Sequence, residues 1–423
     1  MLKDRYGMPL TTVSTAAVDC YVRAMDRFLE VRQGVDALAR EAIGHDERFA
    51  MAWLLLGLDQ RNRGDMAAMA ESMARVEALS DGLSDRETSV LATFAGLGTG
   101  SAEQAEAALR AHLARWPGDA LIMQQAAFLF GILDSRPDRV DRHLRIYEDI
   151  HAAYGDDWYF NGQWAFACEE KGDFARAEDL ARRSVAANPQ NGAAAHSFVH
   201  VLLETGRAAE AARWLETWRA QWRDPDPAFA GHLLWHQALS ELASGDAAAA
   251  AAKLDAIIDS PLFSALTDGA SLAWRLHLDG IATPGVAERL VALPDLGPFP
   301  FSVLHKGMAY ALAGEAAELE RLADSIALPG HEATGRDAAT MLRALSAMAS
   351  GDPQTAAARL DSITESFKNF GGSLAQYEVL DDTLIAALAA AGRGADASAR
   401  LSKRLERRAS PRDRAWAQSL EAA

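Results

Sequence analysis

Glycines recur along this chain at intervals close to 34 residues, each followed by residues that suit a pair of packed helices. Gly172 is followed by Ala177 and Pro189, and Gly206 with Ala211 repeats the first part of this pattern. Glycine adopts the left-handed turn, a small residue lets two helices approach closely, and proline ends a helix. Residues 158–191 are therefore predicted to form one complete helix–turn–helix repeat. The other predicted turn glycines are Gly64, Gly100, Gly245, Gly280, Gly314, Gly351 and Gly392.

A period of about 34 residues is that of the tetratricopeptide repeat, in which helix pairs stack on one another. The sequence is 49% hydrophobic, and it has no run of alternating apolar and polar residues that would predict a strand. We therefore predict an all-α fold, a tetratricopeptide-type helix-turn-helix repeat superhelix of about eleven helix pairs. The first helix should begin near Ser14, whose side chain is a suitable N-cap.

The repeats predict one continuous helical-repeat superhelix over residues 1–423. Within it we distinguish N-terminal repeats 1–157, central repeats 158–260 and C-terminal repeats 261–423. Proline-rich interruptions at residues 224–227 and 294–300 are candidate kinks, because proline cannot continue a helix.

The formal net charge of -17 repels nucleic acid and anionic membrane surfaces, so we expect neither as a partner. The only basic run, from Lys403 to Arg414, is interpreted as a solvated last helix. No stretch of about 18 apolar residues is present, and the first residues lack the apolar core of a signal peptide. Cys20 and Cys168 have no metal-binding or redox spacing. A cytoplasmic location is therefore expected.

Histidines concentrate in one part of the chain. Four of the 11 histidines are His196, His200, His232 and His236, and they form two His-x-x-x-His pairs. A spacing of four residues places both imidazoles of a pair on one helix face. The repeat register puts all four on first helices, where His196, His200 and His232 should face the concave groove. The sequence thus predicts a shared pocket, with His236 at its edge.

Three interpretations of this pocket remain open. Neutral imidazoles could bind a divalent metal, or a histidine could transfer protons or hold a ligand without a metal. Alternatively, the histidines pack between helices and bond to Glu204, Glu241 or backbone groups. No metal ligand is assigned firmly, and the cofactor is unknown. The catalytic and metal candidates are the same four residues, His196, His200, His232 and His236.

Aromatic residues occur in the same part of the chain. Trp158, Trp164 and Trp235 lie on predicted first helices and are expected to form the wall of the ligand pocket. A stripe of tryptophans on one second helix is interpreted as core. Its members are Trp214, Trp218 and Trp222.

Two weaker candidates have plain structural alternatives. Gly371-Gly372-Ser373 could form a nucleophile-bearing or anion-binding loop, but such a segment before a helix usually supplies a turn and an N-cap. Glu169 or Glu170 could act as a general base, but glutamates near a helix end are mostly solvated.

Several blocks of this sequence resemble the tetratricopeptide repeat protein 38 family. They are residues 6–14, Ala165-Phe166 with Glu169-Glu170 and Gly172, Asn188-Pro189, residues 196–200, Glu204-Thr-Gly-Arg207, residues 232–239, and residues 371–376. The resemblance implies a helical-repeat architecture and a shared pocket, without a settled reaction. The family carries histidines where this chain has Trp164 and Leu374. If the family pocket is a metal site that needs those histidines, this chain should bind metal weakly.

These observations favour a helical-repeat protein whose His/Trp-lined concave pocket binds a small molecule or short peptide, with or without acid–base chemistry. One alternative is a scaffold that recruits protein partners along the groove. Another is a metal-dependent enzyme that uses the paired His-x-x-x-His motifs. Whether the chain is an enzyme, and its oligomeric state, are left open.

Overall fold

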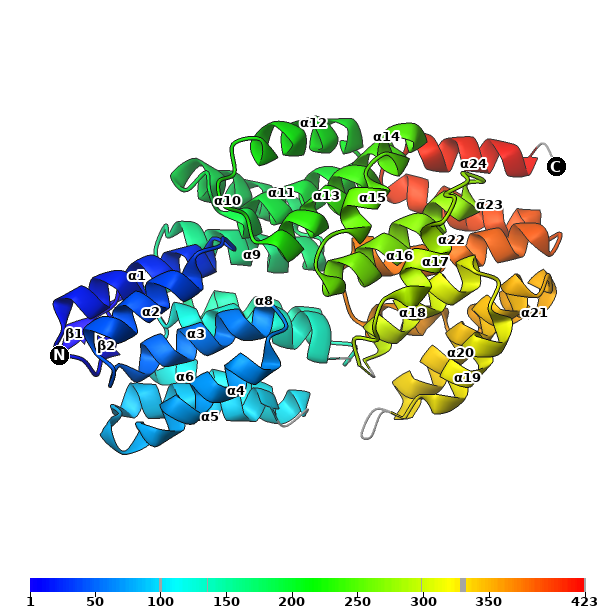
Figure 1. Ribbon diagram of the computed structural model, residues 1–423. Coiled ribbons are helices and arrows are strands. Elements are labelled where there is room, and N and C mark those ends of the chain that lie inside the picture. The colour runs from blue at the N-terminus through cyan, green and yellow to red at the C-terminus, as the bar shows by residue number, and fades with distance from the viewer. Residues whose placement is uncertain (99–100, 135, 298, 328–331, 422–423) are drawn as a thin grey trace. The chain divides into compact units, whose positions relative to one another are not determined.

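The computed structural model describes residues 1–98, 101–134, 136–297, 299–327 and 332–421. The described residues form 24 α-helices, most of which follow one another as antiparallel neighbours (Figure 1). In sequence order they make eleven pairs and a final helix, α24 (Pro411–Glu421). The prediction of an all-α repeat fold of about eleven pairs is therefore confirmed.

The first five pairs are α1 (Thr15–Leu29) with α2 (Val35–His45), α3 (Ala50–Asn62) with α4 (Met66–Ala78), α5 (Asp85–Gly98) with α6 (Ala102–Arg115), α7 (Ala120–Phe128) with α8 (Arg139–Ile150), and α9 (Trp158–Lys171) with α10 (Phe174–Ala187).

The other six pairs are α11 (Gly192–Glu204) with α12 (Ala208–Arg219), α13 (Pro227–Ala243) with α14 (Ala247–Ala251) and α15 (Leu254–Ile258), α16 (Leu262–Leu278) with α17 (Val286–Ala292), α18 (Pro300–Leu312) with α19 (Ala316–Ser325), α20 (Glu332–Ala349) with α21 (Pro353–Asp361), and α22 (Leu374–Ala390) with α23 (Gly394–Arg407).

Local sequence signals begin and end these helices as predicted. The side chain of Ser14 accepts a hydrogen bond from the backbone N–H of Ala17 at 3.2 Å and so caps α1. Eight predicted turn glycines have φ between 73° and 91°, the left-handed region that other residues avoid. They are Gly64, Gly172, Gly206, Gly245, Gly280, Gly314, Gly351 and Gly392. Gly100 lies outside the described residues.

A small sheet precedes the first helix and is the exception to the all-helical pattern. Strand β1 (Leu2–Lys3) pairs antiparallel with β2 (Pro9–Leu10). The carboxylate of Asp4 accepts hydrogen bonds of 2.9 Å from the backbone N–H groups of Tyr6 and Met8, which fixes the intervening turn. At two residues per strand, this sheet leaves the all-α fold class unchanged.

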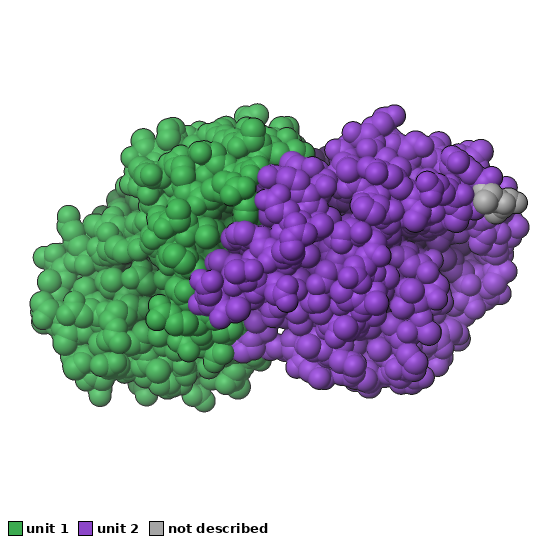
Figure 2. Space-filling model, turned by 90° about the horizontal axis from the view of Figure 1, so that it is seen from above, with its two compact units in different colours: residues 1–134, 138–198, 222–226 green, residues 135–137, 199–221, 227–423 purple. Residues whose placement is uncertain are grey.

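The chain divides into two compact units, coloured separately in Figure 2. Unit 1 contains residues 1–134, 138–198 and 222–226, and unit 2 contains residues 135–137, 199–221 and 227–423. The expected division into repeats 1–157, 158–260 and 261–423, and the bends at the proline-rich segments, stay predictions.

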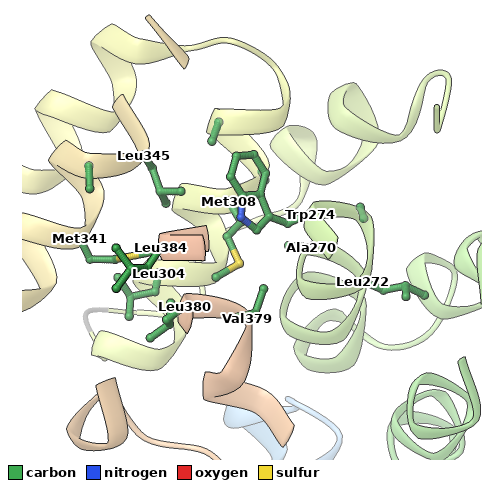
Figure 3. Close-up of a cluster of buried hydrophobic side chains, with 14 of the residues drawn as sticks. Ala270, Leu272, Trp274, Leu304, Met308, Met341, Leu345, Val379, Leu380 and Leu384 are labelled. Carbon is green, nitrogen blue, oxygen red and sulfur yellow. The ribbon is translucent and has the colours of Figure 1, made fainter. Parts of the chain in front are cut away.

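A continuous hydrophobic core fills unit 2 from the end of α11 to α23. Figure 3 shows Met308 beside Trp274 in this core, with Val379 close by. The indole N–H of Trp274 donates to the hydroxyl of Thr383 at 2.9 Å, so its one polar group is satisfied. This packing holds α16, α18 and α22 together and gives the neighbouring α13 a rigid support.

Candidate functional site

Three histidines come together within unit 2. His200 lies in the second half of α11, and His232 and His236 lie one turn apart on α13. His200 and His236 are fully buried, whereas the side chain of His232 keeps 17% of its surface exposed. We call these three residues the imidazole cluster. Its members come from successive repeats, since His236 follows His200 by 36 residues.

The central ring of the imidazole cluster, His236, faces the other two rings through Nε2. Nε2 of His236 lies 3.2 Å from Nε2 of His200 and 3.2 Å from Nε2 of His232. The ring centroids are 4.4 Å and 4.6 Å from that of His236, with the His232 ring nearly perpendicular to it. Both outer imidazoles therefore lie within hydrogen-bonding distance of one central nitrogen.

A buried carboxylate fixes the outer face of His232. Asp268 on α16 places Oδ2 3.1 Å from Nδ1 of His232, and Ser264 donates its hydroxyl to the same carboxylate at 2.6 Å. Because an ionised carboxylate only accepts hydrogen bonds, Nδ1 of His232 carries the proton and Nε2 presents a lone pair to His236. Asp268 is buried and 36 residues from His232.

Trp235 forms the aromatic side of the imidazole cluster. Its ring stacks on His232 with centroids 5.4 Å apart and 19° between the planes, and it also contacts His236. Trp235 is fully buried, and its indole N–H has no hydrogen-bond partner among the described residues. A buried donor left unpaired costs about 1–3 kcal/mol, so an acceptor supplied by a ligand would recover that energy.

The remaining predicted site residues belong to unit 1. His196 lies one turn before His200 on α11, in the part of the helix assigned to unit 1, and its ring packs on Phe166 with centroids 5.3 Å apart. The Trp158 ring lies under the guanidinium of Arg5 at 4.8 Å. That these residues share a pocket with the imidazole cluster stays a prediction.

Trp164 is 9% exposed and is surrounded by side chains of its own unit. The guanidinium of Arg176 covers its ring at 4.1 Å, and His151 and Phe160 pack on it with centroids 5.5 and 5.6 Å away. Its role as a pocket wall, like that of Trp158, stays a prediction.

The alternative in which Glu204 and Glu241 hold the histidines stays a prediction, and both glutamates have cationic partners. Glu204 is buried and its Oε1 accepts from Nη1 of Arg408 at 2.7 Å. The Glu241 carboxylate pairs with the ammonium of Lys253 at 2.7 Å. One partner of His232 is Asp268, which the sequence did not predict. The spacing was the available signal, because one repeat length separates His232 from Asp268, as it separates His200 from His236.

The basic run from Lys403 to Arg414 is not simply a solvated helix. Arg404 and Arg408 are buried, and Nη1 of Arg404 lies 2.5 Å from Oδ1 of Asp382. Nε of Arg412 lies 2.7 Å from Oδ2 of Asp279. The interpretation was wrong for these arginines because their acidic partners lie outside the run, 22 residues away for Arg404 and 133 for Arg412, and leave no pattern within it. We call the set the C-terminal ion-pair network; its members are Arg404, Arg407, Arg408, Arg412, Glu204, Asp279, Glu378, Asp381 and Asp382.

The two weaker candidates are resolved differently. Ser373 is the N-cap of α22, and its backbone N–H donates to Oε1 of Gln376 at 2.9 Å, which supports the turn-and-cap interpretation. Glu169 is 2% exposed, so the expectation that it is solvated is wrong. It sits on α9, whose Ala165 and Cys168 are also buried, so this face of the helix points inward.

Residues 170–231 match the family described as tetratricopeptide repeat. The match begins near the end of α9 and ends within α13. Across the part of the chain that the structure describes, no helix is both long and apolar enough to cross a bilayer.

Several solved structures are similar to this chain at low identity. Human IFIT1, solved as a dimer with m7Gppp-AAAA, is 13% identical over 94% of this chain and 91% of that chain, with a TM-score of 0.44. The P58(IPK) TPR domain is 12% identical over 89% and 98%, with a TM-score of 0.21. Naa15/Naa10 bound to HypK-THB is 13% identical over 92% and 63%, with a TM-score of 0.20.

Proposed function

We propose that this tetratricopeptide repeat protein binds a small molecule or short peptide at the imidazole cluster of unit 2. The observation that carries the proposal is that Nε2 of His236 contacts Nε2 of both His200 and His232 beside a stacked tryptophan, with His232 alone of the three reaching the surface.

The side chains around the cluster indicate what kind of ligand it suits. Trp235 offers a flat apolar face and an unpaired indole donor, and the guanidinium of Arg275 lies 5.9 Å from the same ring. A ligand with a planar or apolar part and a hydrogen-bond acceptor, such as a carboxylate, would satisfy both. Acid–base chemistry at His232, held by Asp268, belongs to the same proposal.

The test is a binding screen on the full chain with aromatic carboxylic acids and short peptides that end in an aromatic residue. Compounds that raise the melting temperature are then titrated by calorimetry. Trp235→Phe, which keeps the ring and removes the donor, should weaken binding by roughly tenfold, and His232→Ala by more. Trp214→Phe on α12 is the matched control and should bind as the wild type does. Hits that bind equally well to His232→Ala and Trp235→Phe would contradict the proposal.

A scaffold that recruits protein partners is the second candidate function. The tetratricopeptide repeat match at residues 170–231 favours it, because repeat surfaces often bind extended peptides. A partner captured by the wild type and equally by the His232→Ala variant would favour the scaffold over the ligand pocket.

The family to which this chain belongs, its location in the cell and its classes of partner are also proposals. The blocks at residues 6–14, 196–200, 232–239 and 371–376 support membership of the tetratricopeptide repeat protein 38 family, as a bacterial member. Cys20 and Cys168 are buried free thiols, which supports a reducing compartment such as the cytoplasm. The net charge of -17 supports partners other than nucleic acid and membranes.

A further inference from the structure

A cysteine, a glutamate and a histidine meet on the first helix pair of unit 1. Cys20 lies on α1, and Glu41 and His45 lie one turn apart on α2, which packs against α1 (Figure 1). The sulfur of Cys20, a carboxylate oxygen of Glu41 and a ring nitrogen of His45 all lie within 4.8 Å of one another. We propose that these three side chains, which we call the Cys20 site, bind one divalent transition metal, for which Zn²⁺ is the best fit.

The Cys20 site is separate from the imidazole cluster. All three of its residues belong to unit 1, whereas the imidazole cluster belongs to unit 2. The inference therefore does not depend on the function proposed for the imidazole cluster, and either can fail without the other.

The spacing of the Cys20 site suits one small ion. A zinc–sulfur bond of about 2.3 Å and zinc–nitrogen or zinc–oxygen bonds of about 2.0–2.1 Å place the ligand atoms of a tetrahedral site about 3.3–3.7 Å apart. The limit of 4.8 Å therefore requires a movement of no more than about 1–1.5 Å by any ligand atom. Glu41 and His45 are exposed, so their side chains can turn inward, while Cys20 is only 5% exposed and stays in place.

Helix α2 presents its two ligands together. A spacing of four residues places Glu41 and His45 on the same helix face, the face that reaches Cys20. His45 also lies in the last turn of α2. The C-terminal end of a helix carries a partial negative charge, which attracts a cation to this position.

The charges around the sulfur also favour a cation. Burial, and next the Glu41 carboxylate, raise the pKa of the Cys20 thiol, so the metal-free thiol keeps its proton. Asp19 acts in the same direction, and Arg23 opposes it. A bound ion would release the thiol proton to water. Its two positive charges would then balance the thiolate of Cys20 and the carboxylate of Glu41, with a neutral imidazole from His45.

The ligand atoms limit the kind of metal. A thiolate and an imidazole suit Zn²⁺ and Co²⁺, whereas Mg²⁺ and Ca²⁺ prefer oxygen ligands. Three protein ligands leave one tetrahedral position for water. Because the ligands come from both α1 and α2, the ion would clasp the two helices and stabilise the folded form of unit 1.

The test uses Co²⁺ as the probe on the full chain, kept reduced and treated first with a chelator. Bound thiolate gives Co²⁺ a charge-transfer band in the near ultraviolet that imidazole and carboxylate ligands do not give, so ions bound at other histidines do not interfere. We expect one equivalent of Co²⁺ to develop this band and Zn²⁺ to remove it. Cys20→Ser should abolish the band, and His45→Gln should weaken binding at least tenfold. Cys168→Ser, which changes the other buried thiol, on α9, is the matched control and should keep the band.

Several results would overturn the inference. They are an absence of the charge-transfer band at saturating Co²⁺, a band that persists in Cys20→Ser, or a band that a folded Cys168→Ser variant loses equally. If circular dichroism shows that Cys20→Ser is unfolded, Glu41→Gln and His45→Gln replace it, because both side chains are exposed. Wild-type affinity for Co²⁺ in both of these variants would then contradict the Cys20 site.

Discussion

The carboxylate of Asp268 holds the ring of His232 through its Nδ1 proton at 3.1 Å, from a helix that follows one repeat later. In Asp268→Asn, the amide can offer its own N–H to Nδ1, so we expect the proton of His232 to move to Nε2. Nitrogen-15 chemical shifts of the imidazoles distinguish the two tautomers. A wild-type His232 protonated at Nε2 would contradict this prediction. The variant should also lose about 1–3 kcal/mol of stability.

The C-terminal ion-pair network should be costly to break at Arg408. Arg408→Met leaves the buried carboxylates of Glu204 and Glu378 without one of their cations, and we expect a loss of about 3–5 kcal/mol in unfolding free energy. The control is Arg321→Met on α19, where the guanidinium and Glu318 are both solvent-exposed. That change should cost less than about 1 kcal/mol. Urea unfolding of the variants measures both effects, and equal losses would count against the network.

The loss of folding stability at acid pH should depend on His143. Burial lowers the pKa of this imidazole to about 3, with the nearby Arg139 as a smaller cause. Below the ordinary imidazole pKa of 6.5, His143 therefore takes up a proton in the unfolded chain but not in the folded chain. The free energy of unfolding falls as the pH drops from 6.5 toward 3. Between pH 7 and pH 4.5, the His143→Gln variant should lose about 2–3 kcal/mol less unfolding free energy than the wild type does. Parallel stability curves for variant and wild type would show that His143 titrates normally.

Turn glycines should differ in their tolerance of a side chain. Gly206 has φ of 76°, and a Cβ there would lie 2.8 Å from the backbone nitrogen of Ala409. Gly392 has nearly the same φ but open space around it. We expect Gly392→Ala to cost about 1 kcal/mol, from the left-handed backbone alone, and Gly206→Ala to cost at least about 2 kcal/mol. Similar denaturation midpoints for the two variants would contradict the predicted collision.

What the sequence predicted well depends on neighbouring residues. Ser14 caps the first helix, and Gly172 and Gly206 adopt left-handed turns, because each signal acts within a few residues. The pairing of His232 with His236 follows likewise from one helical turn. These features are consequences of backbone geometry, so one sequence is enough to predict them.

What the sequence missed depends on distant residues. Asp268 meets His232 across a full repeat, and only the repeat length itself could have indicated it. Arg408 meets Glu204 across 204 residues, for which no local spacing exists. The basic run that contains Arg408 resembles a solvated helix because half of its charged side chains are exposed. The other charged side chains of the run are of the same amino-acid types, so composition does not distinguish them.

The pairing of Arg407 and Arg408 with Glu204 has a consequence for how unit 2 folds. In an open array, each repeat contacts only its neighbours, and folding can spread from any point. Here the segment after α23 must reach α11 before the carboxylate of Glu204 is neutralised, which raises the contact order of unit 2 and slows its folding. During synthesis, α11 through α22 would leave the ribosome with this buried charge still unpaired. Unit 2 is therefore expected to mature only after Arg407 and Arg408 have been synthesised, and a chain cut before these residues should be more sensitive to proteases.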